Sequence, residues 1–173
     1  MSLQAFIRIG NLDFNQYLIY KSITTLCHQI FKNDKMKAQK NVRIGSQIFI
    51  GISALSLGYV ALLSIFNPQS TMDLVATTLP NTDAISSIRG IYGGVGLVIT
   101  IQLIYLLIKD HYKGLLFLSL FWGAYALSRL ITIFSDGALG DFGNQWIVIE
   151  STFCVVAFIL LLLSKNKLQK AIS

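Results

Sequence analysis

Charged residues are scarce in this 173-residue sequence, in which only 13% of positions are Asp, Glu, Lys or Arg. Soluble domains average about 25% charged residues, whereas 54% of this chain is hydrophobic and its mean hydropathy is +0.63. There is too little polar surface here to cover a water-soluble globule, so the composition is typical of a membrane protein. A separate basic face is also lacking, because the Lys and Arg residues flank apolar runs. We therefore expect no binding of nucleic acid, despite a pI of about 9.4.

Metal-binding and catalytic motifs are lacking as well. Cys27 and Cys154 lie far apart, and His28 and His111 are isolated, so the spacing of a metal site is not found. The nucleophile, zinc-protease and phosphate-loop motifs of soluble enzymes are missing too. We therefore expect no metal and no cofactor, and a binding or accessory role rather than an enzyme. No residue is assigned as catalytic.

Four apolar stretches are each long enough to cross a bilayer, which takes about 20 apolar residues. They are roughly Ile44–Phe66, Ile85–Ile108, Leu115–Ser135 and Trp146–Ser164. Backbone polar groups in lipid must bond within their own segment, so each span is predicted to be a helix. The predicted fold is all-α, an integral-membrane four-helix bundle formed by residues 36–173.

Proline, glycine and polar residues mark the connections between these spans. Asn67-Pro68 ends the first span, because proline disfavours helix in the residue before it. Residues 70–76 suit a short helical turn. Residues 109–114 predict a short polar turn between antiparallel second and third spans. The glycine-rich residues 136–143 predict a loop before the fourth.

The distribution of basic residues predicts the orientation of the spans. Seven precede the first span, two lie between the second and third, and three follow the fourth. The other two connections carry only acidic charges. Both termini and the 109–113 connection are thus predicted to be cytoplasmic, in a bacterial inner membrane. The twelve basic residues explained in this way are Arg8, Lys21, Lys32, Lys35, Lys37, Lys40, Arg43, Lys109, Lys113, Lys165, Lys167 and Lys170.

Residues 1–35 form a separate N-terminal cytoplasmic segment with two interpretations. Within Phe14–Phe31, the apolar and polar residues fit a helix that lies on the membrane surface. The alternative is that Met36 is the natural first residue and that a mis-assigned start codon precedes it. Both interpretations remain open at this point.

Three ionisable residues inside the predicted spans, Arg89, Arg129 and Glu150, are not explained by orientation. Each lies roughly 6–9 Å inside the outer end of its helix, at a rise of about 1.5 Å per residue. An unpaired charge in a span costs at least about 2.5–3.5 kcal/mol, so we expect Glu150 to pair with one or both arginines. The three residues thus lie at a similar depth and form one charged layer near the outer face. Two arginines and one glutamate leave one positive charge in this layer. Either Asp136 balances that charge, or the layer binds an anion.

Aromatic residues accompany these charges at helical spacing. Tyr92 follows Arg89, and Tyr125 and Trp122 precede Arg129. They would line the same layer or serve in packing. The ligands that suit such a layer are an anionic lipid, a small anion, a quinone-like molecule or a carboxylate of a partner.

Glycines are concentrated at the start of the second span. Gly90 and Gly94 form a G-x-x-x-G pair. Gly93 and Gly96 extend the part of the helix surface that carries no side chains. Small residues let helices approach closely in a membrane, so these four glycines predict a helix-packing face. A homo-oligomer or a larger membrane complex would also be compatible with it.

A set of motifs resembles a known bacterial family of four-helix membrane proteins. The set comprises R-G-I-Y-G-G at 89–94, the preceding Asn67-Pro68, and the later Arg129, Asp136-Gly137 and Glu150. The family is domain of unknown function 4345, and the resemblance covers roughly residues 37–164. Ala138 stands where the family often has a proline. The resemblance implies an integral membrane protein without an established activity, with signature positions Arg89, Tyr92, Gly93, Gly94, Arg129, Asp136 and Glu150.

Three functions therefore remain. The first is a binding or accessory subunit whose Arg/Glu cluster near the outer face holds an anionic group. In the second, the cluster is purely structural and the function lies in helix contacts within a larger complex. The third is a small transporter or membrane enzyme that uses Glu150.

Overall fold

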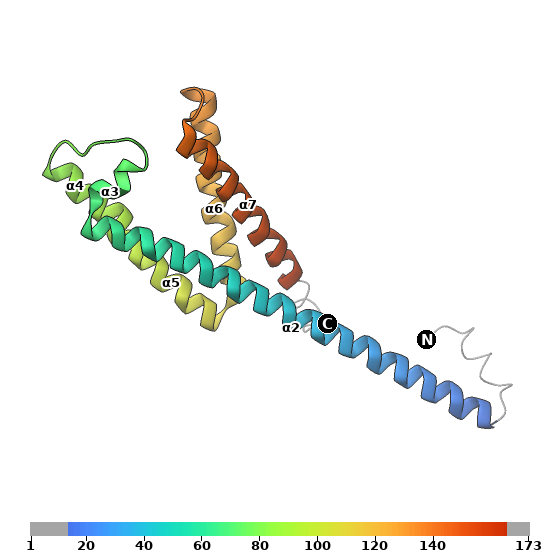
Figure 1. Ribbon diagram of the computed structural model, residues 1–173. Coiled ribbons are helices and arrows are strands. Elements are labelled where there is room, and N and C mark those ends of the chain that lie inside the picture. The colour runs from blue at the N-terminus through green and yellow to red at the C-terminus, as the bar shows by residue number, and fades with distance from the viewer. Residues whose placement is uncertain (1–13, 166–173) are drawn as a thin grey trace. The chain divides into compact units, whose positions relative to one another are not determined.

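The computed structural model describes residues 14–165, with side chains described for residues 17–164. Every regular element in that part of the chain is a helix (Figure 1). The chain divides into two compact units, Met1–Asn41 and Val42–Ser173. Residues 1–13, the first part of the expected N-terminal segment, lie outside the described residues. So do Arg8, Lys167 and Lys170, three of the basic residues from which the orientation was predicted.

The predicted all-α class is confirmed, and four helical segments are long and apolar enough to cross a membrane. The helices extend past the apolar runs into polar flanking residues, because their caps lie there. α2 contains both the N-terminal amphipathic stretch and the first apolar run. In chain order the elements are α2 (Phe14–Phe66), α3 (Pro68–Asp73), α4 (Thr82–Ile88), η1 (Arg89–Val95), α5 (Gly96–Lys109), α6 (His111–Ser135) and α7 (Asp141–Lys165).

Asparagine side chains begin the two short helices that follow α2. Asn67 accepts a hydrogen bond from the backbone N–H of Ser70, and Pro68 occupies the first turn of α3, where no N–H is needed. Asn81 accepts from the N–H of Ala84 at 2.8 Å and so begins α4. The helical segment of the second predicted span therefore starts at Thr82, a few residues earlier than its apolar run.

A single residue, Asp110, connects α5 to α6, where the sequence predicts a six-residue polar turn. Its carboxylate accepts from the backbone N–H of Lys113 at 3.2 Å and lies 3.3 Å from the Lys113 ammonium. Burial alone would raise the pKa of Asp110, but these contacts with Lys113 and the backbone N–H of Tyr112 outweigh it and lower that pKa below its ordinary value. Asp110 caps the first turn of α6 directly, so the polar residues that follow it are already helical. The connection therefore does not need the longer turn that the sequence predicts.

The segment R-G-I-Y-G-G-V forms a π-helix, η1, which interrupts the second apolar helix. A π-helix bonds residues five apart, so its side chains lose the three-to-four-residue spacing of an α-helix. Three of its seven residues are glycine, which weakens the regular α-helical alternative. The α-helical spacing used above for Arg89 and Tyr92 therefore does not hold here.

Two of the four clustered glycines bring this segment against α2. A Cβ atom on Gly93 would lie 2.6 Å from Cγ1 of Ile65, and one on Gly96 would lie 2.9 Å from Cβ of Ala61. Gly90 has no neighbour within 4 Å, and Gly94 meets only the backbone of Arg89 in its own segment. The close approach thus depends on Gly93 and Gly96, not on the Gly90–Gly94 pair.

The buried core of the second unit lies where α2, α5, α6 and α7 meet. Its aromatic part is a short chain of rings: Phe49 contacts Phe153 with centroids 5.5 Å apart, and Phe153 contacts Trp122 edge-on at 5.2 Å. Gly114 at the start of α6 lies against Ile50 of α2. The buried apolar residues of this cluster are Ile50, Ala54, Leu103, Leu115, Leu118, Trp122, Ala157 and Leu161.

We predict that Gly96→Ala destabilises the protein by about 1–3 kcal/mol, the usual effect of overpacking. The new methyl group would meet Cβ of Ala61, which cannot rotate away, so the helix backbones must separate. Unfolding in mixed micelles, followed by circular dichroism, measures the change.

Gly90→Ala is the matched control. Its methyl group enters open space, and alanine favours helix over glycine by about 1 kcal/mol. This variant should therefore be neutral or more stable. Equal losses in the two variants would contradict the assignment of the packing face.

Candidate functional site

The clearest polar site in the second unit is an ion pair between α6 and α7. Arg129 donates from Nε to Oε2 of Glu150 at 2.7 Å and from Nη2 to Oε1 at 2.9 Å. The Glu150 side chain is only 2% exposed and that of Arg129 is 20% exposed. The short connection after Ser135 folds α7 back along α6, and this brings the two residues to the same level.

This geometry satisfies both charges at once. Two parallel hydrogen bonds from a planar guanidinium to a carboxylate are the strongest common form of such a pair. Removing two ions from water is costly, and only good geometry with full hydrogen bonding offsets that cost. The pair is therefore neutral as a unit, and each oxygen of the Glu150 carboxylate accepts a hydrogen bond from Arg129.

An aromatic ring from the first turn of α7 lies beside the arginine of the ion pair. The guanidinium carbon of Arg129 lies 5.7 Å from the ring centre of Phe142, within the range of a cation–π contact. Phe142 in turn contacts Trp146, with centroids 5.7 Å apart. Sequence reasoning missed Phe142, although its place in the first turn after a short connecting loop was an available signal.

Arg89 is not part of this ion pair. Its side chain is exposed, and its Nε donates to the backbone carbonyl of Ile65 at 3.1 Å. That carbonyl belongs to the last turn of α2, where carbonyl groups have no partner within the helix and where a cation is favourable. Within residues 17–164, no carboxylate lies within ion-pairing distance of Arg89.

The remaining predicted members lie around these two arginines without joining them. Asp136 is exposed and ends α6, and in the described part of the chain it forms no ion pair. Gly137 follows it with φ of 109°, a conformation that favours glycine. Tyr92 and Tyr125 are both exposed over more than a third of their surface.

Trp122 lies in the core rather than at a polar surface. It is 5% exposed, and its Nε1 has no hydrogen-bond partner among the described residues. Ser53 on α2 is fully buried, and its hydroxyl also has no hydrogen-bond partner among the described residues. Among the described residues, no three His, Cys, Asp or Glu side chains gather as metal ligands.

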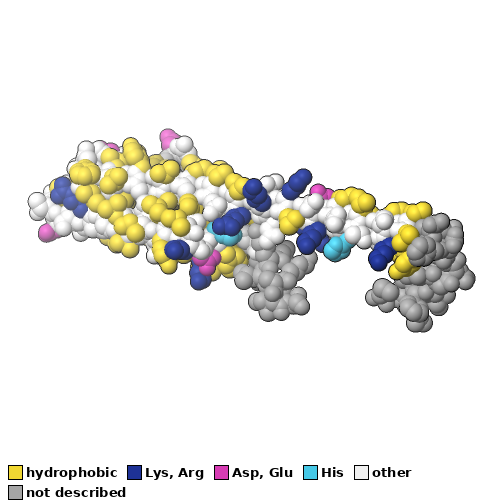
Figure 2. Space-filling model, turned by 90° about the horizontal axis from the view of Figure 1, so that it is seen from below, with side chains coloured by type: hydrophobic (Ala, Val, Ile, Leu, Met, Phe, Trp, Pro, Cys, Tyr) yellow, Lys and Arg dark blue, Asp and Glu magenta, His cyan; other side chains and the backbone are white. Residues whose placement is uncertain are grey.

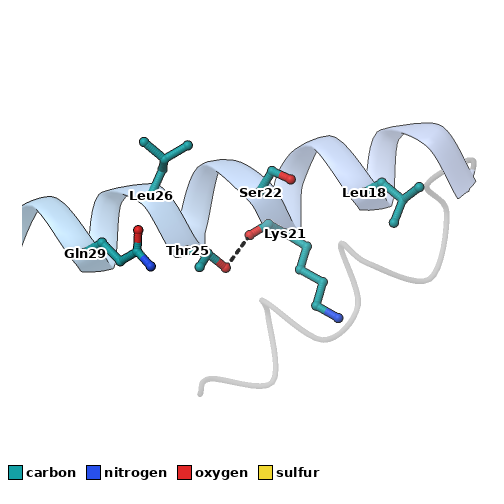
Figure 3. A pocket seen from close by; sticks show the side chains of 6 residues that line it. All are labelled: Leu18, Lys21, Ser22, Thr25, Leu26 and Gln29. Atoms are coloured by element: carbon teal, nitrogen blue, oxygen red, sulfur yellow. Dashed lines mark hydrogen bonds between the residues drawn. The ribbon is translucent and has the colours of Figure 1, made fainter.

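A shallow hollow lies on the first part of α2, within the unit Met1–Asn41 (Figure 3). Thr25 donates to the backbone carbonyl of Lys21 at 2.8 Å, and in Figure 3 Leu26 points away from these two residues. The other lining residues are Leu18, Ser22 and Gln29, all on the same helix. With a single charged side chain and no second element among the described residues, the hollow is not assigned as a site.

Comparison with known proteins gives a family and no relative of known activity. The profile of the family described as domain of unknown function (DUF4345) matches residues 45–161, which is more than half of the chain. The chain therefore belongs to this family, as the resemblance predicted. Neither a curated protein nor a solved structure matches the chain.

We predict that the two halves of the ion pair differ in importance. Arg129→Gln leaves Glu150 charged and buried, and should cost about 3–5 kcal/mol of unfolding free energy. Glu150→Gln should cost less, because the more exposed Arg129 can turn toward water. The double variant should lose less than the sum of the single variants, as expected for groups in direct contact.

Lys113→Gln provides a matched control. Lys113 forms an ion pair with Asp110, but its side chain is 71% exposed, and exposed pairs contribute about 0–1 kcal/mol. Additive losses for Arg129 and Glu150, or a loss as small as that of the control, would contradict a coupled buried pair.

Proposed function

We propose that this member of the family is a multi-pass integral membrane protein of a bacterial inner membrane. Its four long helices would form a bundle with both termini in the cytoplasm. Support comes from large apolar side chains on the outside, such as Phe134 at 86% and Phe66 at 80% exposure. Figure 2 shows apolar side chains spread over the visible face of the second unit and Lys and Arg along the first part of α2. A water-soluble protein rarely exposes so much contiguous apolar surface.

The charges at the helix ends support the proposed orientation. Lys109 and Lys113 flank the α5–α6 connection, whereas residues 67–88 and 136–141 contain only acidic charges. Cytoplasmic connections are the ones enriched in Lys and Arg.

A reporter that is active only in the periplasm tests this orientation. Fused after Ser173 it should be inactive, whereas inserted after Gly140, in the open connection between α6 and α7, it should be active. Activity of the fusion after Ser173 would overturn the orientation.

For the biochemical role, we infer a small binding or accessory protein that holds an anionic group near the outer face. The observation that carries this is the difference between its two arginines. Arg129 is neutralised by Glu150, whereas Arg89 is exposed and, among residues 17–164, bonds only through Nε to a neutral carbonyl. The two terminal nitrogens of Arg89 are suited to a carboxylate or phosphate.

One alternative also has a specific observation in its favour. The Arg129–Glu150 pair is bidentate and enclosed, which supports a structural role for this part of the cluster within α6 and α7. A transporter or enzyme that uses Glu150 is less well supported, because both carboxylate oxygens are occupied by Arg129.

A short-chain anionic lipid, dihexanoylphosphatidylglycerol, tests the anion site, with dihexanoylphosphatidylcholine as the neutral comparison. At ten times its Kd, a ligand stabilises by about 1.4 kcal/mol, or roughly 3–6 °C in melting temperature for a protein of this size. We expect this rise with the anionic lipid alone, and we expect Arg89→Gln to abolish it.

Arg89→Lys keeps the charge and should retain part of the rise, which separates charge from shape. Arg129→Gln, corrected for its lower starting stability, should keep the full rise. A rise with the anionic lipid that Arg89→Gln leaves unchanged would reject Arg89 as an anion site.

A further inference from the structure

An apolar groove runs along the outside of the contact between α2 and α5. It has a volume of about 570 Å³, which is within the usual range for ligand sites. Leu55, Gly58 and Leu62 of α2 form one wall, and Leu97 and Ile104 of α5 form the other. Leu55 is 77% exposed, so the groove opens away from the buried core.

The groove has no charged side chain among its lining residues. The hydroxyl of Thr100, which lies in the groove, already donates to the backbone carbonyl of Gly96 at 2.9 Å. An occupant would therefore meet hydrocarbon over almost its whole length. This favours a hydrocarbon chain over a polar substrate.

The length of the groove matches one leaflet of a membrane. From Gly51 to Leu62 the chain rises about 16 Å along α2, and the hydrocarbon core of a bilayer is about 30 Å thick. A lipid chain that lies alongside the helices would thus fill the groove from end to end.

A helix from a second copy fits the groove less well. Close packing of helices in a membrane needs small residues that are free to receive a backbone. The two glycines of the groove are already covered: a Cβ atom on Gly51 would lie 3.4 Å from Leu107, and one on Gly58 would lie 3.1 Å from Thr100.

The guanidinium of Arg89 lies beyond one end of the groove. Leu62 lines that end, and Ile65 lies one helical turn farther on, about 5 Å along α2. The carbonyl of Ile65 accepts the hydrogen bond from Arg89. Residues three apart on a helix lie on neighbouring faces. The free nitrogens of Arg89 are therefore within reach of a headgroup whose chain occupies the groove.

From these features we propose that the α2–α5 groove binds one acyl chain of an anionic phospholipid, whose phosphate lies at Arg89. This rests on the proposed function, because it identifies the anionic group at Arg89 as a lipid headgroup. It adds that the lipid is held along its chain as well as at its charge.

Native mass spectrometry of the full chain, released from nanodiscs of equal parts phosphatidylglycerol and phosphatidylcholine, tests the proposal. We expect one retained lipid, with phosphatidylglycerol favoured about tenfold, because the choline of phosphatidylcholine cancels the charge of its own phosphate and so weakens the attraction to Arg89. Leu55→Trp fills the groove from an exposed position and should reduce retention of both lipids several-fold. Ile101→Trp, which adds the same bulk at a 66% exposed position outside the groove lining, should leave retention unchanged.

The outcomes separate the groove from the anion site. Arg89→Gln should remove the preference for phosphatidylglycerol but leave some retention, and Arg89→Lys should keep the preference. Retention of both lipids that survives Leu55→Trp unchanged would reject the groove while leaving the anion site standing. Equal retention of the two lipids by the unaltered protein would reject the anionic headgroup at Arg89, and a dimer that Leu55→Trp dissociates would show that a second copy occupies the groove instead.

Discussion

A guanidinium cannot lose its proton in a protein, and the placement of two such groups among apolar helices is the constraint on which the rest depends. Each arginine connects one antiparallel pair of helical segments near its connecting loop. Arg89 bonds from η1 to the last turn of α2, and Arg129 bonds from α6 to α7. One arginine meets a carbonyl dipole and the other a full opposite charge. That difference leaves the charge of Arg89 without an ion-pair partner among residues 17–164, whereas Glu150 balances the charge of Arg129.

Much of this arrangement follows from the sequence, because strong physical costs determine it. The length of the apolar runs and the need to satisfy the backbone predict four long helices, and the structure has them. The cost of an unpaired charge predicts a partner for Glu150. The sequence left open whether one or both arginines fill this role, because the answer depends on how α7 folds back along α6. Arg89 was harder to place, because a backbone carbonyl leaves no signature in the sequence.

The π-helix and the glycines mark the limit of reasoning from spacing. G-x-x-x-G patterns assume an α-helical repeat, and the repeat changes within η1. Gly93 and Gly96 therefore approach α2 while Gly90 faces open space. Two helices also begin earlier in the chain than the apolar runs predict, for a similar local reason. Asn81 caps α4 and Asp110 caps α6, and each cap lies among polar residues before the apolar run. Capping acts through single side chains, and a hydropathy pattern does not register them.

The one-residue connection at Asp110 has a mechanical consequence. Only the φ and ψ angles of this residue separate the last turn of α5 from the first turn of α6. α6 has 25 residues, so it is a lever about 37 Å long. Arg129 lies about 27 Å along this helix from His111, so a rotation of about ten degrees at Asp110 would displace it by roughly 5 Å. Most of one long helix thus separates the joint from the Arg129–Glu150 pair, and a small torsional change at the first is amplified at the second.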